Sequence, residues 1–178
     1  MRILMIEGSP HREGSSNMLA GEFARGAREA GHSVEVFDAA HADIRPCRGC
    51  DVCGMSGPCA IKDDMPGLRE RILGSDMVVF VTPLYYFGVS AQLKAVIDRF
   101  YAFNGQLTSR HLKSALIVAA WDSNDWTMKD VSAHYGTVSR YLGMEDIGQI
   151  LATGCGTPGM TARSPFMEHA YRLGRNLE

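Results

Sequence analysis

Four of the five cysteines in this 178-residue chain lie close together, separated by two, two and five residues. They are Cys47, Cys50, Cys53 and Cys59. Four thiolates at such short gaps suit a [4Fe–4S] cluster, whose binding loops are often compact. Zinc also accepts four cysteines, but its sites usually join two separated pairs, and a reversible disulfide needs any two of the four. The spacing therefore predicts metal or redox chemistry and leaves these three alternatives open.

A second group of polar residues follows the first apolar run of the chain, in the glycine-containing segment 8–17. Its side-chain donors include Ser9, Ser15, Ser16 and Asn17. Backbone N–H groups at a helix start, together with the positive end of the helix dipole, bind phosphate. A plain serine N-cap would explain only Ser15 or Ser16, so we expect a phosphate site. It does not match an ATP-binding P-loop, because Gly14 is followed by two serines and not by lysine.

Three consecutive aromatic residues lie in the segment 82–90, between an apolar run and a segment of helical period. They are Tyr85, Tyr86 and Phe87. A planar ring system such as an isoalloxazine is bound by flat apolar contacts with backbone polar groups nearby, whereas an aromatic plug would only close the core. The position of the segment after a buried strand favours the ligand contact. Trp121 and Trp126 flank the next such loop, where they form either a wall or lid of the site or ordinary packing.

The elements that position these residues follow from the periodicity of the chain. Short apolar runs alternate with longer segments of helical period, which is the pattern of a parallel sheet covered by helices on both faces. The expected strands are Arg2–Glu7, Ser33–Phe37, Met77–Thr82, Ala115–Ala120 and Glu145–Ala152. The expected helices are Ser16–Ala30, Met65–Leu73, Ser90–Phe103, Met128–Leu142 and Pro165–Leu177.

Right-handed crossovers bring the loops that follow parallel strands to one edge of the sheet. We therefore expect an α/β fold with a doubly wound, five-stranded sheet of order 2-1-3-4-5 and a ligand at the switch point between strands 1 and 3. Residues 1–178 are expected to form one domain with a cysteine-rich insertion loop at about residues 40–64. The segment Gly154–Gly159 matches G-x-G-x-x-G by chance, because that fingerprint must open a strand–helix–strand unit and only one helix is expected after it.

The composition limits the partners of the protein. A formal net charge of -2 leaves no basic excess for nucleic acid or an anionic membrane, so we expect small molecules or proteins as partners. The N-terminus has an apolar run of only four residues before Glu7, too few for the apolar region of a signal peptide or for a membrane span. We therefore expect a cytoplasmic protein.

The segments Gly8–Asn17 and Pro83–Phe100 resemble the NAD(P)H-dependent FMN reductases and the iron-sulfur flavoproteins of the flavodoxin-like superfamily. The resemblance spans nearly the whole chain. It implies that the turn binds the FMN phosphate, that the Pro-x-Tyr loop lies along the flavin, and that NAD(P)H is an electron donor. The positions that it carries over are Ser9, His11, Ser15, Ser16, Asn17, Pro83, Leu84, Tyr85, Tyr86, Phe87 and Gly88. His11 stands where many relatives have arginine, so its phosphate contact would be weaker and would depend on pH.

Residues 46–65 are similar to the cluster-binding segment of iron-sulfur flavoproteins, which implies a [4Fe–4S] cluster on the four cysteines. We therefore expect an FMN-dependent oxidoreductase that passes electrons from a reduced donor, through cluster and FMN, to a small acceptor such as oxygen, peroxide or a quinone. Two alternatives stay open: an NAD(P)H-dependent FMN or quinone reductase without a cluster, and a redox-sensing module that binds zinc or forms disulfides.

The second strand is expected at the edge of the sheet, so the cysteine loop after it would face the flavin of a neighbouring subunit. A homodimer or homotetramer follows from this placement. No catalytic acid or base is identified, because hydride transfer to a flavin needs stacking and access more than a dedicated proton donor.

Overall fold

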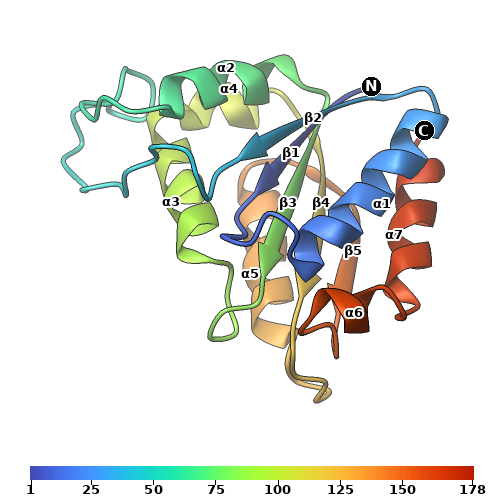
Figure 1. The fold of residues 1–178 in the computed structure, drawn as a ribbon. Helices are drawn as coiled ribbons and strands as arrows, with labels where there is room; N and C mark the ends of the chain where they lie inside the picture. The colour runs from blue at the N-terminus through green and yellow to red at the C-terminus, as the bar shows by residue number, and fades with distance from the viewer.

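The computed structural model describes residues 1–178 and contains a five-stranded, all-parallel sheet of order β2-β1-β3-β4-β5 (Figure 1). The strands are β1 (Arg2–Glu7), β2 (Ser33–Asp38), β3 (Met77–Pro83), β4 (Lys113–Ala119) and β5 (Glu145–Ala152). The order confirms the predicted doubly wound sheet, with its reversal between β1 and β3. The fourth strand begins earlier than the predicted Ala115, because the polar Lys113 and Ser114 still pair with Met77 and Val78 of β3.

Helices cover both faces of this sheet (Figure 1). They are α1 (Ser15–Glu29), α2 (Met65–Gly74), α3 (Ala91–Arg99), the 3-10 helix η1 (Phe100–Phe103), α4 (Asn104–Thr108), α5 (Lys129–Tyr141), α6 (Pro158–Thr161) and α7 (Phe166–Arg175). The prediction of one helix over residues 90–103 was wrong in its last turn. Phe100 and Phe103 are both buried, and a 3-10 helix places residues three apart on one face.

Alternating side chains of the strands fill two separate cores. In β1, Leu4 and Ile6 enter the core under α2, α3 and α5, whereas Ile3 and Met5 enter the core under α1 and α7. Strands buried on both sides need nearly continuous apolar sequence, which explains the run from Met77 to Val81 in β3.

Two glycines allow α1 and α7 to cross at short distance. Gly26 of α1 lies against the carbonyl of Tyr171, and Gly174 of α7 lies against the carbonyl of Phe23, so neither position has room for a Cβ atom. The crossing fixes α1, whose N-terminus borders the site described below.

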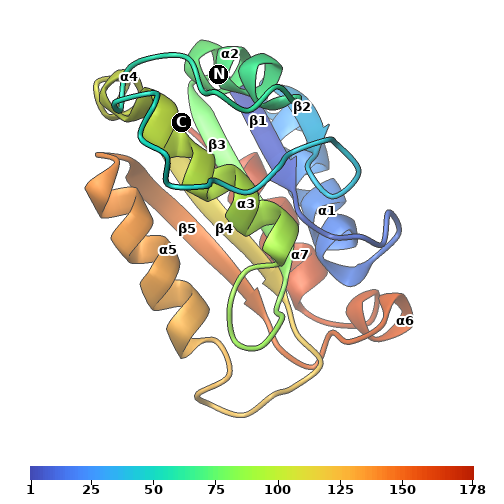
Figure 2. The same ribbon diagram turned by 90° about the vertical axis from the view of Figure 1, so that its left-hand side faces the viewer.

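The loops that follow the strands lie at the carboxyl ends of the sheet. The longest one, residues 39–64, joins β2 to α2 without any helix or strand and runs across α3 (Figure 2). None of the helices combines the length and the apolar character that a bilayer span requires.

Candidate functional site

A cavity of about 940 Å³ opens at the carboxyl edge of the sheet, where β1 and β3 lie side by side. Several loops far apart in sequence line it. The lining residues with polar or aromatic side chains include Ser9, His11, Arg12, Glu13, Ser15, Ser16, His41, Tyr85, Trp121, Cys155 and Thr157. The switch point predicted from the strand order therefore coincides with a cavity large enough for a cofactor.

The turn after β1 leaves the start of a helix without a side-chain cap. The Ser9 side chain is buried, and its Oγ accepts from the His11 N–H at 3.2 Å. Gly14 stands at the N-cap of α1, where no side chain caps the helix and no acidic residue occupies its first turn. The first N–H groups of α1 are therefore free for a bound phosphate, and the helix dipole favours its charge.

The predicted turn residues have different roles in the structure. Ser9, His11, Ser15 and Ser16 line the cavity. Asn17 does not: its side-chain amide donates to the carbonyls of His11 and Arg12 at 3.4 and 3.3 Å. Asn17 therefore supports the shape of the turn.

The three aromatic residues of the β3–α3 loop do not form one surface. Pro83, Leu84 and Tyr85 line the cavity. Tyr86 is fully exposed, and the Phe87 ring packs against Trp126 with the ring centroids 5.1 Å apart.

The reason for this division is a tight turn closed by two backbone hydrogen bonds between Tyr85 and Gly88, both at 3.1 Å. Its central residues, Tyr86 and Phe87, have φ values of +45° and +62°, a region that non-glycine residues rarely adopt. Strain of this kind is typical of loops at functional sites.

Ser90 braces the phosphate turn against this loop, a role that sequence reasoning missed. Its buried hydroxyl donates to the Gly8 carbonyl at 2.7 Å and accepts from the Leu93 N–H, and its own N–H donates to the Thr82 hydroxyl at 2.9 Å. A Cβ at Gly8 would lie 2.6 Å from the Ser90 Oγ, so the brace also requires glycine there. Only the N-cap position of Ser90 could have been inferred from the sequence.

A charged group at the β2 side of the cavity was also missed. Asp38 contacts Arg12 at 3.4 Å and the Nδ1 of His41 at 2.9 Å, and both of these basic side chains line the cavity. Asp38 is paired in register with Glu7 of β1. Burial and the nearby charge of Asp38 raise the pKa of Glu7 to about 7. Arg12 and His41 thus form, with the acidic pair Asp38 and Glu7, a charged group beside the turn after β1.

The opposite wall of the cavity comes from the loops after β4 and β5. The Trp121 indole lies over Gly156 so closely that a Cβ there would collide with the ring. Cys155 is buried, and its N–H donates to the Ala120 carbonyl at 2.7 Å. The G-x-G-x-x-G match at Gly154–Gly159 follows the last strand of the sheet and leads only into the short α6. It is therefore part of the cavity wall and not a dinucleotide fingerprint.

The four clustered cysteines line a second cavity, of about 460 Å³, beside α3 and η1. Cys47 and Cys50 are exposed, whereas Cys53 and Cys59 are half-buried against the core. All four are free thiols, and no three His, Cys, Asp or Glu side chains of the chain stand in metal-binding geometry. The donor set fits an iron-sulfur cluster in its chemistry, but the thiols are not assembled around a common centre.

The comparisons with known proteins agree with this geometry. The model of the NADPH-dependent FMN reductase family matches residues 1–156. An iron-sulfur flavoprotein of Archaeoglobus fulgidus is 27% identical over 179 residues, which covers 99% of this chain and 79% of that protein.

An iron-sulfur flavoprotein of Methanocaldococcus jannaschii is 35% identical over 99 residues, which covers 56% of this chain and 51% of that protein. The chain thus spans about half the length of this relative. An NAD(P)H:quinone oxidoreductase from Methanothermobacter marburgensis has the same fold, with a TM-score of 0.82 at 22% identity over 100% of this chain and 96% of that chain.

The family match includes the phosphate turn, the loop after β3 and the cysteine segment. The chain belongs to the NADPH-dependent FMN reductase family.

Proposed function

We propose that this protein is an FMN-dependent oxidoreductase that takes electrons from NAD(P)H. The observation that carries the proposal is the cavity at the switch point between β1 and β3, which brings the uncapped N-terminus of α1 beside the Pro83–Tyr85 loop. Doubly wound sheets bind their ligands at this point. Membership of the family supports FMN as the ligand.

In this proposal, different residues around the cavity contact different parts of the cofactor. The hydroxyls of Ser9, Ser15 and Ser16 and the first N–H groups of α1 bind the phosphate. Arg12, which pairs with Asp38, adds positive charge at the cavity, and the ring of His41 contacts the same carboxylate. The Pro83–Tyr85 loop lies along the ring system, and Trp121 closes the far wall. Bound FMN supplies hydride acceptance and single-electron release.

We further propose that the cysteine segment binds a [4Fe–4S] cluster. All four cysteines line one cavity, and four thiolates are the usual ligands of such a cluster. Gly49, Asp51, Gly54 and Met55 have left-handed backbones, from which concave groups of N–H donors for anionic clusters are built. The names of the two archaeal relatives support the same assignment. In this proposal, the exposed Cys47 and Cys50 move toward the half-buried pair when the cluster binds.

The cysteine segment follows β2, which is an edge strand of the sheet, and its cavity shares no lining residue with the first one. We therefore propose that electrons pass between subunits. In a homodimer or homotetramer, the cysteine segment of one subunit would face the flavin of another. Light scattering of the purified protein tests this part directly, and a monomer that still transfers electrons from cluster to flavin would contradict it.

The decisive experiment is the analysis of protein that is purified without oxygen. We expect one FMN and about four iron atoms per chain, and flavin reduction by NADH or NADPH. Iron-free protein that still oxidises NADPH through FMN would contradict the cluster and favour a plain FMN or quinone reductase. Colourless protein that contains zinc would contradict the flavin and the cluster together.

A further inference from the structure

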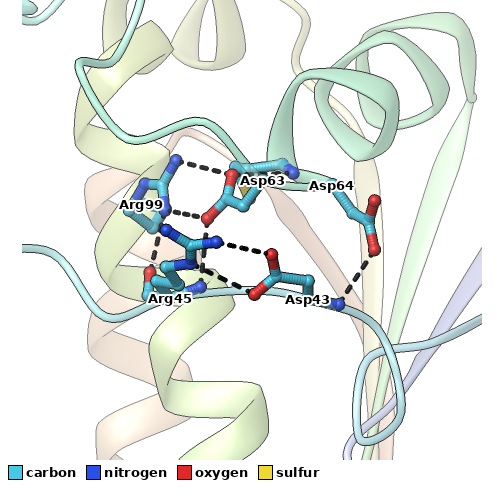
Figure 3. A network of polar contacts seen from close by, with 6 residues as sticks. Asp43, Arg45, Asp63, Asp64 and Arg99 are labelled. Carbon is cyan, nitrogen blue, oxygen red and sulfur yellow. Dashed lines mark hydrogen bonds and ion pairs between the residues drawn. The ribbon is translucent and has the colours of Figure 1, made fainter.

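A fully buried ion pair lies behind the cysteine cavity, at the end of α3 (Figure 3). Arg99 donates from Nη1 and Nη2 to the two oxygens of Asp63, at 2.6 and 3.1 Å. The side chains of Arg99 and Asp63 are 1% and 0% exposed. Such a bidentate pair has fixed geometry, and burial of two charges requires that geometry to be good.

The pair joins the two ends of the cysteine segment. Arg99 Nη1 also donates to the carbonyl of Arg45 at 2.8 Å, and Asp63 accepts from the Arg45 N–H at 3.0 Å and the Met65 N–H at 3.1 Å. We call Arg99, Asp63 and the Arg45 backbone the clasp. Figure 3 shows that it brings the residues before and after the cysteines together at one point of α3.

One donor of the clasp has no acceptor. The Nε of Arg99 is the only buried side-chain nitrogen or oxygen in the chain without a hydrogen-bond partner. Cys59 is near this donor: it is half-buried four residues before Asp63, and it lines the cysteine cavity together with Asp98, which precedes Arg99 on α3. A buried N–H without a partner is unfavourable, and in native proteins such a group usually has a role.

We propose that Arg99 is a positioning residue for the iron-sulfur cluster, whose Nε–H donates to the Cys59 sulfur when that thiolate binds iron. The inference rests on the proposed cluster in the cysteine segment. A metal-bound thiolate is a better acceptor than a thiol, so cluster binding supplies the partner that Arg99 lacks. Hydrogen bonds to cluster sulfurs also raise the reduction potential, so Arg99 tunes the cluster that it helps to hold.

The test compares Arg99→Lys with Arg69→Lys. Lysine keeps the charge toward Asp63 but has no Nε–H in the guanidinium position, whereas Arg69 pairs with Glu70 at the surface. For Arg99→Lys we expect iron loss in air to be about tenfold faster. We also expect the cluster that remains to have a more negative reduction potential. Arg69→Lys keeps the wild-type values. Loaded Arg99→Lys protein with an unchanged potential would overturn the proposal.

Asp63→Asn separates two effects of Arg99, the retention of the cluster and the setting of its reduction potential. It weakens the clasp but leaves the Arg99 side chain in place, so we expect faster iron loss with a nearly unchanged potential in the loaded fraction. A potential shift as large as that of Arg99→Lys would mean that the whole clasp, and not the Arg99 Nε–H, sets the potential, which overturns the assignment.

A spectroscopic measurement tests the inference without any substitution of Arg99. With ¹⁵N-arginine labelling, electron–nuclear double resonance of the reduced cluster should show coupling to an arginine nitrogen in both the wild type and Arg48→Lys, a variant that removes the arginine lining the cavity. Absence of the coupling in loaded protein would overturn the inference. Wild-type protein that never binds iron would instead refute the proposed cluster, and the inference with it.

Discussion

The two cavities of this molecule are built in opposite ways. At the switch point, the donors for a ligand are backbone N–H groups that the start of α1 fixes, and Ser90 braces the turn through buried hydrogen bonds. In the cysteine segment, the clasp fixes the ends, and the donors are side chains, half of them exposed. A site made of backbone donors exists as soon as the sheet forms. A site made of thiolates is completed by the metal that binds to it.

The largest expected effect comes from removing one thiolate. In Cys50→Ala we expect the purified protein to lose its iron and keep its FMN, because the two cavities share no residue. Iron and FMN per chain are measured together. Cys155→Ala is the control, since Cys155 lines the other cavity and should leave the iron in place. Loss of FMN from Cys50→Ala would contradict the independence of the two sites.

Ser90→Ala is expected to have the opposite result, in which FMN binding weakens and the iron stays bound. Loss of the buried hydroxyl leaves the Gly8 carbonyl and the Leu93 N–H without their partner, and we expect a fall of about 1–3 kcal/mol in the free energy of unfolding. FMN binding should weaken as the turn loosens, while the iron content stays constant. Denaturant unfolding and FMN titration measure both effects. The exposed Ser109→Ala is a matched control, and equal effects in the two variants would disprove the brace.

A substitution in the strained turn after β3 should change the free energy of unfolding by less, and in the opposite direction to Ser90→Ala. Tyr86→Asn should raise the free energy of unfolding by about 1 kcal/mol, because asparagine tolerates the left-handed backbone better than tyrosine. Tyr141→Asn, on an exposed helical residue, should give no such gain.

The same Tyr86→Asn variant tests the prediction that Tyr86 contacts the flavin. Tyr86 projects into solvent and does not line the cavity of its own chain, so a monomeric site predicts unchanged FMN affinity. Weaker FMN binding would place Tyr86 against the flavin of a neighbouring subunit and would support the oligomeric site.

A pH dependence of stability is expected from Glu7. Folding raises its pKa from the ordinary 4.5 to about 7, so the folded state favours the protonated form. The corresponding stabilisation is fully present below the ordinary pKa and is lost as the pH rises to about 7. Glu7→Gln should remove this slope from the melting temperature, whereas Glu35→Gln, at an exposed position, should keep it. A wild-type slope that survives in Glu7→Gln would contradict the assignment.

The sheet and the first cavity could be predicted because their signals are local. Continuous apolar runs such as Met77–Val81 identify buried strands, and the serine-rich turn after β1 lies where strand order requires a ligand. The predicted helix over residues 90–103 differs from the structure mainly at its end. There α3 gives way to η1 because of how Phe100 and Phe103 pack, which periodicity alone does not encode.

The missed residues act through contacts between distant parts of the chain. Ser90 bonds to Gly8 across 82 positions, and Arg99 bonds to Arg45 across 54. Each of them looks like an ordinary helix residue in the sequence. The three aromatic residues point in different directions for another reason: Tyr86 and Phe87 occupy a turn conformation that their residue types disfavour.

The clasp also makes the positions of β2, α2 and α3 independent of the length of the cysteine segment. Once Arg45 and Asp63 are joined on α3, the chain between them is a closed loop, and doubling a flexible loop adds only about 0.6 kcal/mol of closure entropy. Segments of different length can therefore be exchanged at this position while β2, α2 and α3 stay in place. A transplant of the cysteines into a related reductase has to carry the arginine and the aspartate with them.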